Sequence, residues 1–205
     1  MLDSDKLIRE RGFELIAGLD EAGRGPLAGP VVAASVILQP SSPIIDGLDD
    51  SKKLSLKVRE QLFKEIKRHS LAIGVGIISE KMIDASDILK ASHLAMSQAL
   101  DRLKIKPELV LIDGPFKINS SLPQIALVAG DALSPSIAAA SIVAKVVRDR
   151  IMDFYDKKYP QYGFRYNRGY PTLAHKSSIH KYGPCPIHRR SFRPIKEISQ
   201  KSGLF

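Results

Sequence analysis

An apolar run that ends in two adjacent carboxylates constrains the fold of this chain more than any other feature. Residues 15–19 are apolar, Asp20 and Glu21 follow at once, and residues 22–30 are rich in glycine and proline. Apolar runs bounded by Gly and Pro are typical of buried strands. Buried acids are costly unless they are paired or bind a metal ion. We therefore expect a core strand over residues 13–20 with a cation at its end.

Strand-like and helix-like segments alternate along the rest of the chain. Apolar segments of strand length follow at residues 31–38, 71–78, 108–112 and 124–129. Helices are expected over 55–69, 87–103, 134–158 and 173–181, the first with Ser55 as its N-cap. Strands followed by alternating helices and strands favour one α/β layer domain. We place this domain at residues 1–158 and a basic C-terminal segment, packed on it, at residues 159–205.

Positive charge and aromatic side chains gather near the C-terminus. The net charge is +9, and residues 157–196 hold ten Lys or Arg, seven of the thirteen Phe and Tyr, and no Asp or Glu. Such interleaving suits a phosphate backbone with sugars or bases packed beside it. A solvated basic face over a local aromatic core would give a similar pattern, but the complete absence of acids favours nucleic acid.

Composition excludes several other classes of protein. The single cysteine, Cys185, cannot form an internal disulfide and suits a reducing compartment. No apolar run approaches the roughly 20 residues that a transmembrane helix needs. The first residues have neither the basic start nor the apolar core of a signal peptide. We therefore expect a cytoplasmic protein.

Acids follow three of the expected strands, as the pair Asp20-Glu21, as Asp113 and as Asp131. If these strand ends lie side by side, four carboxylates converge on one point. Hard divalent cations would relieve their mutual repulsion, and all-oxygen ligation favours Mg²⁺ or Mn²⁺. Two such ions about 4 Å apart would assist the in-line hydrolysis of a phosphodiester. The alternative is that each acid is only a turn residue, since Asp-Gly at 113–114 is a common turn pair.

These motifs resemble the bacterial ribonuclease HII family, a type 2 ribonuclease H. The resemblance covers about residues 13–193, and its motifs are long and in order. The matching segments are Asp20 to Pro30, Asp50 to Leu54, Ile112 to Gly114, Gly130-Asp131, Ile137 to Lys145, Arg148-Asp149, Gly169 to Thr172, His175 and His188 to Phe192.

The resemblance implies a ribonuclease H-like mixed five-stranded sheet flanked by helices, with the basic helical appendage. It implies a metal-dependent endonuclease that hydrolyses the RNA strand of RNA–DNA hybrids. The same family incises 5′ of ribonucleotides embedded in duplex DNA and leaves a 3′-hydroxyl and a 5′-phosphate. By motif position, the catalytic and metal-binding carboxylates, with two Mg²⁺ or Mn²⁺ ions, fall on Asp20, Glu21, Asp113 and Asp131.

The resemblance also implies how the substrate is recognised. It assigns the loop Gly23-Arg24-Gly25 to sensing the ribose 2′-hydroxyl and Tyr170 to packing on the neighbouring sugar. Glycines let main-chain groups approach a hydroxyl, and the Arg24 guanidinium can grip an adjacent phosphate. Ser51 and Lys52 are either phosphate contacts or a capping serine and a solvated lysine, with little to choose between the two.

Three further expectations concern partners and rival functions. We expect a monomer, and the residues from Gln200 to Phe205 faintly resemble a sliding-clamp peptide, although a frayed hydrophobic terminus is the commoner explanation. The nearest rival is another nuclease of the same fold, such as a junction resolvase or a transposase-like enzyme, which has no reason to carry the Gly-Arg-Gly loop. The other rival is a non-catalytic nucleic-acid-binding protein, against which the four acids argue.

Overall fold

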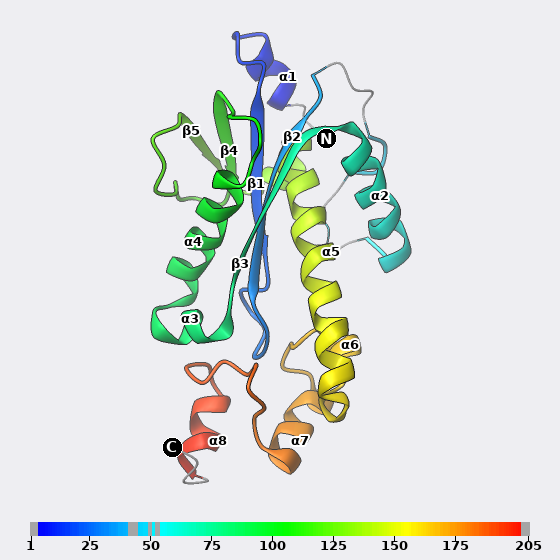
Figure 1. Cartoon of the computed structure of the whole chain (residues 1–205), viewed down its shortest axis with the longest axis vertical. Coiled ribbons are helices and arrows are strands. Elements are labelled where there is room, and N and C mark those ends of the chain that lie inside the picture. The colour runs from blue at the N-terminus through cyan, green and yellow to red at the C-terminus, as the bar shows by residue number, and fades with distance from the viewer. Residues whose placement is uncertain (1–3, 41–44, 49–50, 52–53, 202–205) are drawn as a thin grey trace.

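The computed structural model of the chain describes residues 4–40, 45–48, 51 and 54–201. A five-stranded mixed sheet forms its centre, with the strand order β3-β2-β1-β4-β5 (Figure 1). The strands are β1 (Ile16–Ala22), β2 (Val31–Leu38), β3 (Ser70–Ile78), β4 (Leu109–Asp113) and β5 (Gln124–Leu127). The pairs β1–β2 and β2–β3 are antiparallel, whereas β1–β4 and β4–β5 are parallel. The expected mixed five-stranded α/β fold is confirmed.

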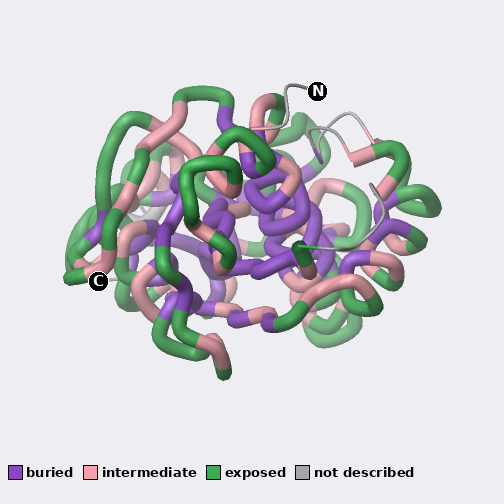
Figure 2. Tube along the Cα trace, turned by 90° about the horizontal axis from the view of Figure 1, so that it is seen from above, coloured by how far each residue is buried: buried purple, intermediate pink, exposed green. Residues whose placement is uncertain are grey.

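Helices cover both faces of this sheet. They are α1 (Ser4–Arg9), α2 (Leu56–His69), α3 (Glu80–Ala85), α4 (Ile88–Asp101), α5 (Pro135–Lys158), α6 (Phe164–Asn167), α7 (Leu173–Tyr182) and α8 (Ile195–Lys201). One hydrophobic cluster joins the sheet to α4, and another joins it to α5 and α2. Figure 2 shows the buried residues gathered in the interior between these layers. No helix within the described residues is long and apolar enough to cross a membrane.

Small residues let the long helices lie close to the strands. A Cβ atom on Gly18 of β1 would stand 2.0 Å from the main chain of Ser136 in α5. A Cβ atom on Gly76 of β3 would stand 1.9 Å from the Ala95 carbonyl oxygen in α4. Since real Cβ atoms never come so close to main-chain atoms, both contacts require glycine. Helix α5 is therefore fixed against the strand that carries Asp20.

The structure corrects two element boundaries and adds four short helices. Strand β1 begins at Ile16 rather than at residue 13, and it continues to Ala22 because residues 20–22 pair with β2. The two acids thus lie inside the strand, not beyond it. Strand β5 ends at Leu127 because Ala129 takes a left-handed conformation (φ 53°) and opens a 3₁₀ turn, Gly130–Ala132. The unexpected helices are α1, α3, α6 and α8; Ser55 caps α2 as expected.

The C-terminal helices α6 to α8 lie at the end of the sheet where β1 turns into β2 (Figure 1). Their cluster includes Phe164, Ile179 and Ile195, which pack with Leu27 of the β1–β2 connection and Met152 of α5. All five side chains are buried. The C-terminal segment therefore packs against the glycine-rich β1–β2 connection and supports it.

Candidate active site

Asp20 and Asp113 lie on adjacent strands at the edge where parallel β1 and β4 part. The last paired residues are Leu19 and Ile112, so the two aspartates come next on each strand. Asp20 is only 5% exposed, and its carboxylate accepts the Glu21 N–H at 2.6 Å. It also accepts a hydrogen bond from the Ser141 hydroxyl of α5. The strand register thus gathers acids against the first half of α5.

Without a cation nearby, the ionised form of Asp20 is unfavourable in this site. Burial raises the pKa of Asp20 well above its usual value, and the nearby Glu21 and Asp113 carboxylates raise it further. Each effect penalises the ionised form. A cation near these oxygens would offset both penalties, and carboxylates are the donors that Mg²⁺ and Mn²⁺ prefer.

A turn joins Asp113 to the fourth predicted acid. The Asp113 Oδ1 atom accepts the Gly130 N–H at 2.8 Å, and Asp131 is the next residue of the same 3₁₀ turn. A Cβ on Gly130 would come within 2.6 Å of the Ile137 Cδ1 atom, so this turn packs tightly against the start of α5. The ends of β1, β4 and β5 therefore meet at one edge of the sheet, as the sequence predicts.

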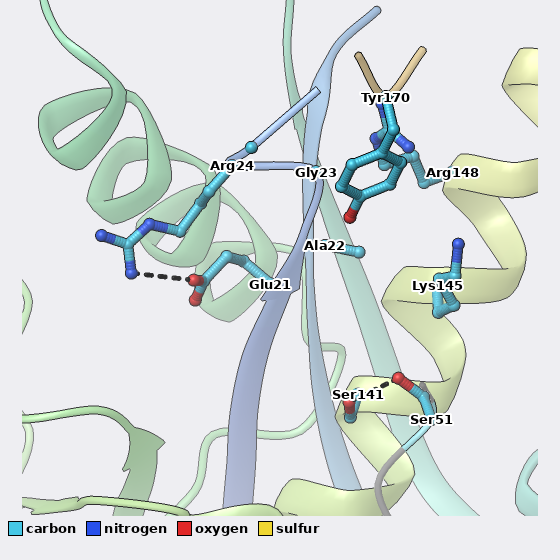
Figure 3. A pocket seen from close by; sticks show the side chains of 10 residues that line it. Glu21, Ala22, Gly23, Arg24, Ser51, Ser141, Lys145, Arg148 and Tyr170 are labelled. Atoms are coloured by element: carbon cyan, nitrogen blue, oxygen red, sulfur yellow. Dashed lines mark hydrogen bonds and ion pairs between the residues drawn. The ribbon is translucent and has the colours of Figure 1, made fainter. Parts of the chain in front are cut away.

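The Glu21 side chain points away from α5. Its carboxylate lies 3.4 Å from the Arg24 guanidinium, and Figure 3 shows both on the side opposite Ser141 and Lys145. As the side chains stand, no three Asp, Glu, His or Cys residues within the described parts of the chain form a group that could hold a metal ion. The donor chemistry at the site thus suits a divalent cation, while the side chains are not yet arranged around one.

Two buried arginines hold the Gly23–Pro30 loop. Arg189 is fully buried and donates to the carbonyl oxygens of Gly23 (2.6 Å), Arg24 (2.8 Å) and Gly29 (2.9 and 3.0 Å). Arg148 of α5 donates to the carbonyls of Ala28 and Pro30, at 3.2 and 3.0 Å. Two guanidinium groups therefore satisfy five of the loop's carbonyls.

These arginines remain charged although they are buried. Burial lowers the pKa of Arg189 to about 9 and that of Arg148 to about 10, both still above neutral pH. Gly23 packs directly on Arg148, because its φ is +100° and a Cβ would stand 2.1 Å from the Arg148 Nε atom. Neither arginine is predicted from the sequence to have a role at the site. The matching segments contain both, but no local pattern distinguishes them from the other arginines of the chain.

The loop, α5 and Tyr170 enclose a cavity of about 180 Å³ (Figure 3). Its lining residues are Glu21, Ala22, Gly23, Arg24, Gly25, Ser51, Ser141, Lys145, Arg148 and Tyr170. Tyr170 is 41% exposed, and its Cε1 atom would stand 3.7 Å from a Cβ on Gly25. The cavity therefore brings the glycine loop, Ser51 and Tyr170 together beside the acids.

The two predicted phosphate contacts have different outcomes. Ser51 lines the cavity but is 3% exposed, and its hydroxyl lies 3.0 Å from the Ser141 hydroxyl. Its carbonyl accepts a hydrogen bond from Arg59 at 3.0 Å. Lys52 lies outside the described residues. Lys145, which also lines the cavity, donates to Asp149 at 2.6 Å.

Comparisons with known proteins agree with this geometry. The family model described as Ribonuclease HII matches residues 17–195. The Ribonuclease HII of Syntrophotalea carbinolica is 49% identical over 193 residues, which cover 94% of this chain and 92% of that protein. The crystal structure of the ribonuclease H2 from Pyrococcus horikoshii OT3 has a TM-score of 0.79 and 29% identity, covering 91% of this chain and 97% of its own.

A second solved structure extends this likeness. It is the RNase HII of Archaeoglobus fulgidus in its complex with PCNA, with a TM-score of 0.73 and 27% identity. The match covers 87% of this chain and 95% of that one. The chain belongs to the ribonuclease HII family, whose members are endoribonucleases that degrade the RNA of RNA–DNA hybrids.

Proposed function

We propose that this enzyme also incises duplex DNA on the 5′ side of embedded ribonucleotides and leaves a 3′-hydroxyl and a 5′-phosphate. The observation that carries the proposal is the cavity that the Gly23-Arg24-Gly25 main chain shares with the Tyr170 ring, beside the acids of β1. A 2′-hydroxyl both donates and accepts hydrogen bonds, and main-chain groups can serve both needs where no side chain intervenes. An aromatic ring opposite them offers a face for the adjacent sugar.

We further propose that Asp20, Glu21, Asp113 and Asp131 hold two Mg²⁺ or Mn²⁺ ions. The raised pKa of Asp20 beside Glu21 and Asp113 supports this, because such a site is most stable with cations present. When bound, the ions would activate the attacking water and stabilise the leaving oxygen. Asp20 would be a ligand of both ions, Glu21 would hold the ion on the side of the scissile phosphate, and Asp113 and Asp131 would complete the ligand sets. Arg24 would release Glu21 to grip the substrate.

The remaining predictions concern the division of the chain and its partners. Residues 1–158 would form the catalytic domain that cleaves the nucleic acid. The basic segment 159–205, together with Ser51 and Lys52, would bind it. Burial of Ser51 supports a positioning role through Ser141 more than a direct contact. A monomer in the cytoplasm stays our prediction. So does the weak sliding-clamp contact, whose residues 202–205 lie outside the described parts.

The substitution Arg24→Ala tests the proposal. We expect it to lower kcat/KM for a duplex with one embedded ribonucleotide by at least tenfold more than for an RNA–DNA hybrid, since one charge-assisted contact is worth about 1.5–3 kcal/mol. Arg68→Ala is the matched control, because Arg68 pairs with Glu65 over the same spacing at 3.2 Å. Equal losses on both substrates would contradict the 2′-hydroxyl role of the loop. Incision of ribonucleotide-free four-way junctions would favour the resolvase alternative.

A further inference from the structure

Two histidines of the C-terminal segment contact one another in the protein interior. His175 of α7 and His188 are 0% and 2% exposed, and their Nε2 atoms lie 3.1 Å apart. The rings of Tyr162 and Phe164 enclose them, with centroids 5.0–6.5 Å from the histidine rings. Neither histidine lies among the acids of the active site. Their contact therefore needs an explanation of its own.

The hydrogen bonds of the pair fix which nitrogen carries each proton. The Cys185 N–H can only donate, and it lies 2.9 Å from His188 Nδ1, closer than the Cys185 carbonyl oxygen at 3.3 Å, so that nitrogen accepts. The proton of neutral His188 then sits on Nε2 and is donated to His175 Nε2. His175 in turn carries its proton on Nδ1, which donates to the Tyr170 carbonyl at 2.8 Å. One chain of three hydrogen bonds thus runs from Cys185 to Tyr170.

The surroundings keep both rings neutral. The hydrophobic cluster around them holds the phenols of Tyr155, Tyr159 and Tyr162 and the Cys185 thiol, and burial raises the pKa of Tyr155, Tyr162 and Cys185. Burial also lowers the pKa of His188 to about 4, with help from the neighbouring ring, and lowers the pKa of His175. A proton added to His175 would set two N–H groups against each other at the 3.1 Å contact, and a proton added to His188 would oppose the Cys185 N–H. The chain of hydrogen bonds is therefore intact at neutral pH.

This chain of hydrogen bonds joins the two segments that flank the glycine-rich loop. On one side, the Leu27 N–H donates to the Gly169 carbonyl at 2.8 Å, one residue before the tyrosine. On the other side, the Gly29 N–H donates to the Ile187 carbonyl at 2.8 Å, one residue before the second histidine. The contact between the two histidines connects these two hydrogen-bonded segments behind the loop. Its loss would remove the link that runs from the Tyr170 main chain through the two histidines to the loop's far side.

We propose that His175 and His188 are positioning residues that hold Tyr170 against the Gly-Arg-Gly loop and thereby set the preference for ribonucleotide junctions. The inference rests on the proposed function, because it assumes that Tyr170 packs on the sugar there. Neither histidine touches substrate in this account. Each acts through the main chain of Tyr170.

The substitution His188→Asn should keep one hydrogen bond of the His188 ring and remove the other. The asparagine oxygen can replace Nδ1 as the acceptor for the Cys185 N–H, but the side chain is too short to reach His175. We expect kcat/KM for the duplex with one embedded ribonucleotide to fall about tenfold, mainly through KM, as the loss of one buried hydrogen bond implies. Cleavage of an RNA–DNA hybrid should change less than twofold. His188→Gln, whose amide reaches the Nε2 position, should restore most of the preference.

Three controls make the outcome decisive. His69→Asn on α2 makes the same replacement away from the C-terminal segment and should leave both substrates unchanged. Melting temperatures and long-range ¹⁵N–¹H spectra of the wild type report folding and the two tautomers, Nδ1–H for His175 and Nε2–H for His188. Parallel losses on both substrates that follow the melting temperature, no rescue by His188→Gln, or identical tautomers would overturn the inference. A wild type without junction preference would contradict the proposed function itself, and with it this inference.

Discussion

Replacing Arg189 with lysine removes the side chain that anchors the Gly-Arg-Gly loop. One terminal nitrogen of the guanidinium donates to the Arg24 carbonyl at 2.8 Å, and the other donates to both the Gly23 and the Gly29 carbonyls at 2.6 and 2.9 Å. A single lysine ammonium cannot take both positions. At least one buried carbonyl then loses its partner, at about 1–3 kcal/mol. We expect the free energy of unfolding to fall by about 1–3 kcal/mol, a large share of the stability of an ordinary domain.

Urea unfolding followed by circular dichroism at pH 7 measures this loss. Arg190→Lys is the matched control, because Arg190 is the next residue in the chain and is exposed. The same change there should alter the free energy of unfolding by no more than about 0.5 kcal/mol. At temperatures where both variants are folded, Arg189→Lys should also lose preference for the embedded ribonucleotide. A stability loss below about 1 kcal/mol would refute the reasoning, because the loop would then hold its shape without the guanidinium.

Three more predictions follow from the same contacts. Burial lowers the pKa of His188 from 6.5 to about 4. As the pH falls, the unfolded chain therefore protonates this ring before the folded protein does. The neutral His188 ring contributes about 3 kcal/mol to the free energy of unfolding above pH 6.5, and this contribution is lost towards pH 4. The difference between urea titrations of the wild type and of His188→Asn measures it. Gly23→Ala should destabilise the fold by more than 1 kcal/mol, since φ is +100° and Arg148 blocks the Cβ, whereas Gly25→Ala should fold normally and lose junction preference. Asp20→Asn should raise the melting temperature in chelator, because it removes a buried charge, and should abolish the further rise that Mg²⁺ produces.

Each of these predictions has a contradicting result. Equal slopes of stability against pH for wild type and His188→Asn would show that this ring does not titrate as its burial implies. Normal stability of Gly23→Ala would mean that the loop can move off Arg148. A melting temperature of Asp20→Asn that still rises with Mg²⁺ would place the cation elsewhere.

Local patterns in the sequence predict the framework of the fold. Strand β2 matches its expected bounds, and Ser55 accepts the Val58 N–H as the cap of α2, because apolar alternation and capping depend on nearby residues. The acids were also predictable, since each follows an apolar run. The extension of β1 through residues 20–22 was not, because it depends on pairing with β2 across the turn.

Contacts between distant segments lie beyond such patterns. Asp5 of the unexpected helix α1 accepts hydrogen bonds from Ser134 and Ser136 at the start of α5, about 130 positions away. The contacts of Arg189 with Gly23 and Gly29 span a similar distance along the chain. No spacing rule connects these residues. The meeting of the strand ends that carry the acids could therefore be predicted from sequence, whereas the scaffold that shapes the neighbouring loop required the structure.

The most direct test of the account is cleavage of a DNA duplex that contains one ribonucleotide, with its products mapped at single-nucleotide resolution. The wild type should cut once, on the 5′ side of the ribonucleotide, only with Mg²⁺ or Mn²⁺, and leave a 3′-hydroxyl. Asp20→Asn should bind the same duplex and leave it intact. Cutting in the presence of chelator, or turnover by Asp20→Asn in Mg²⁺, would contradict the metal-dependent site that we place at the ends of β1 and β4.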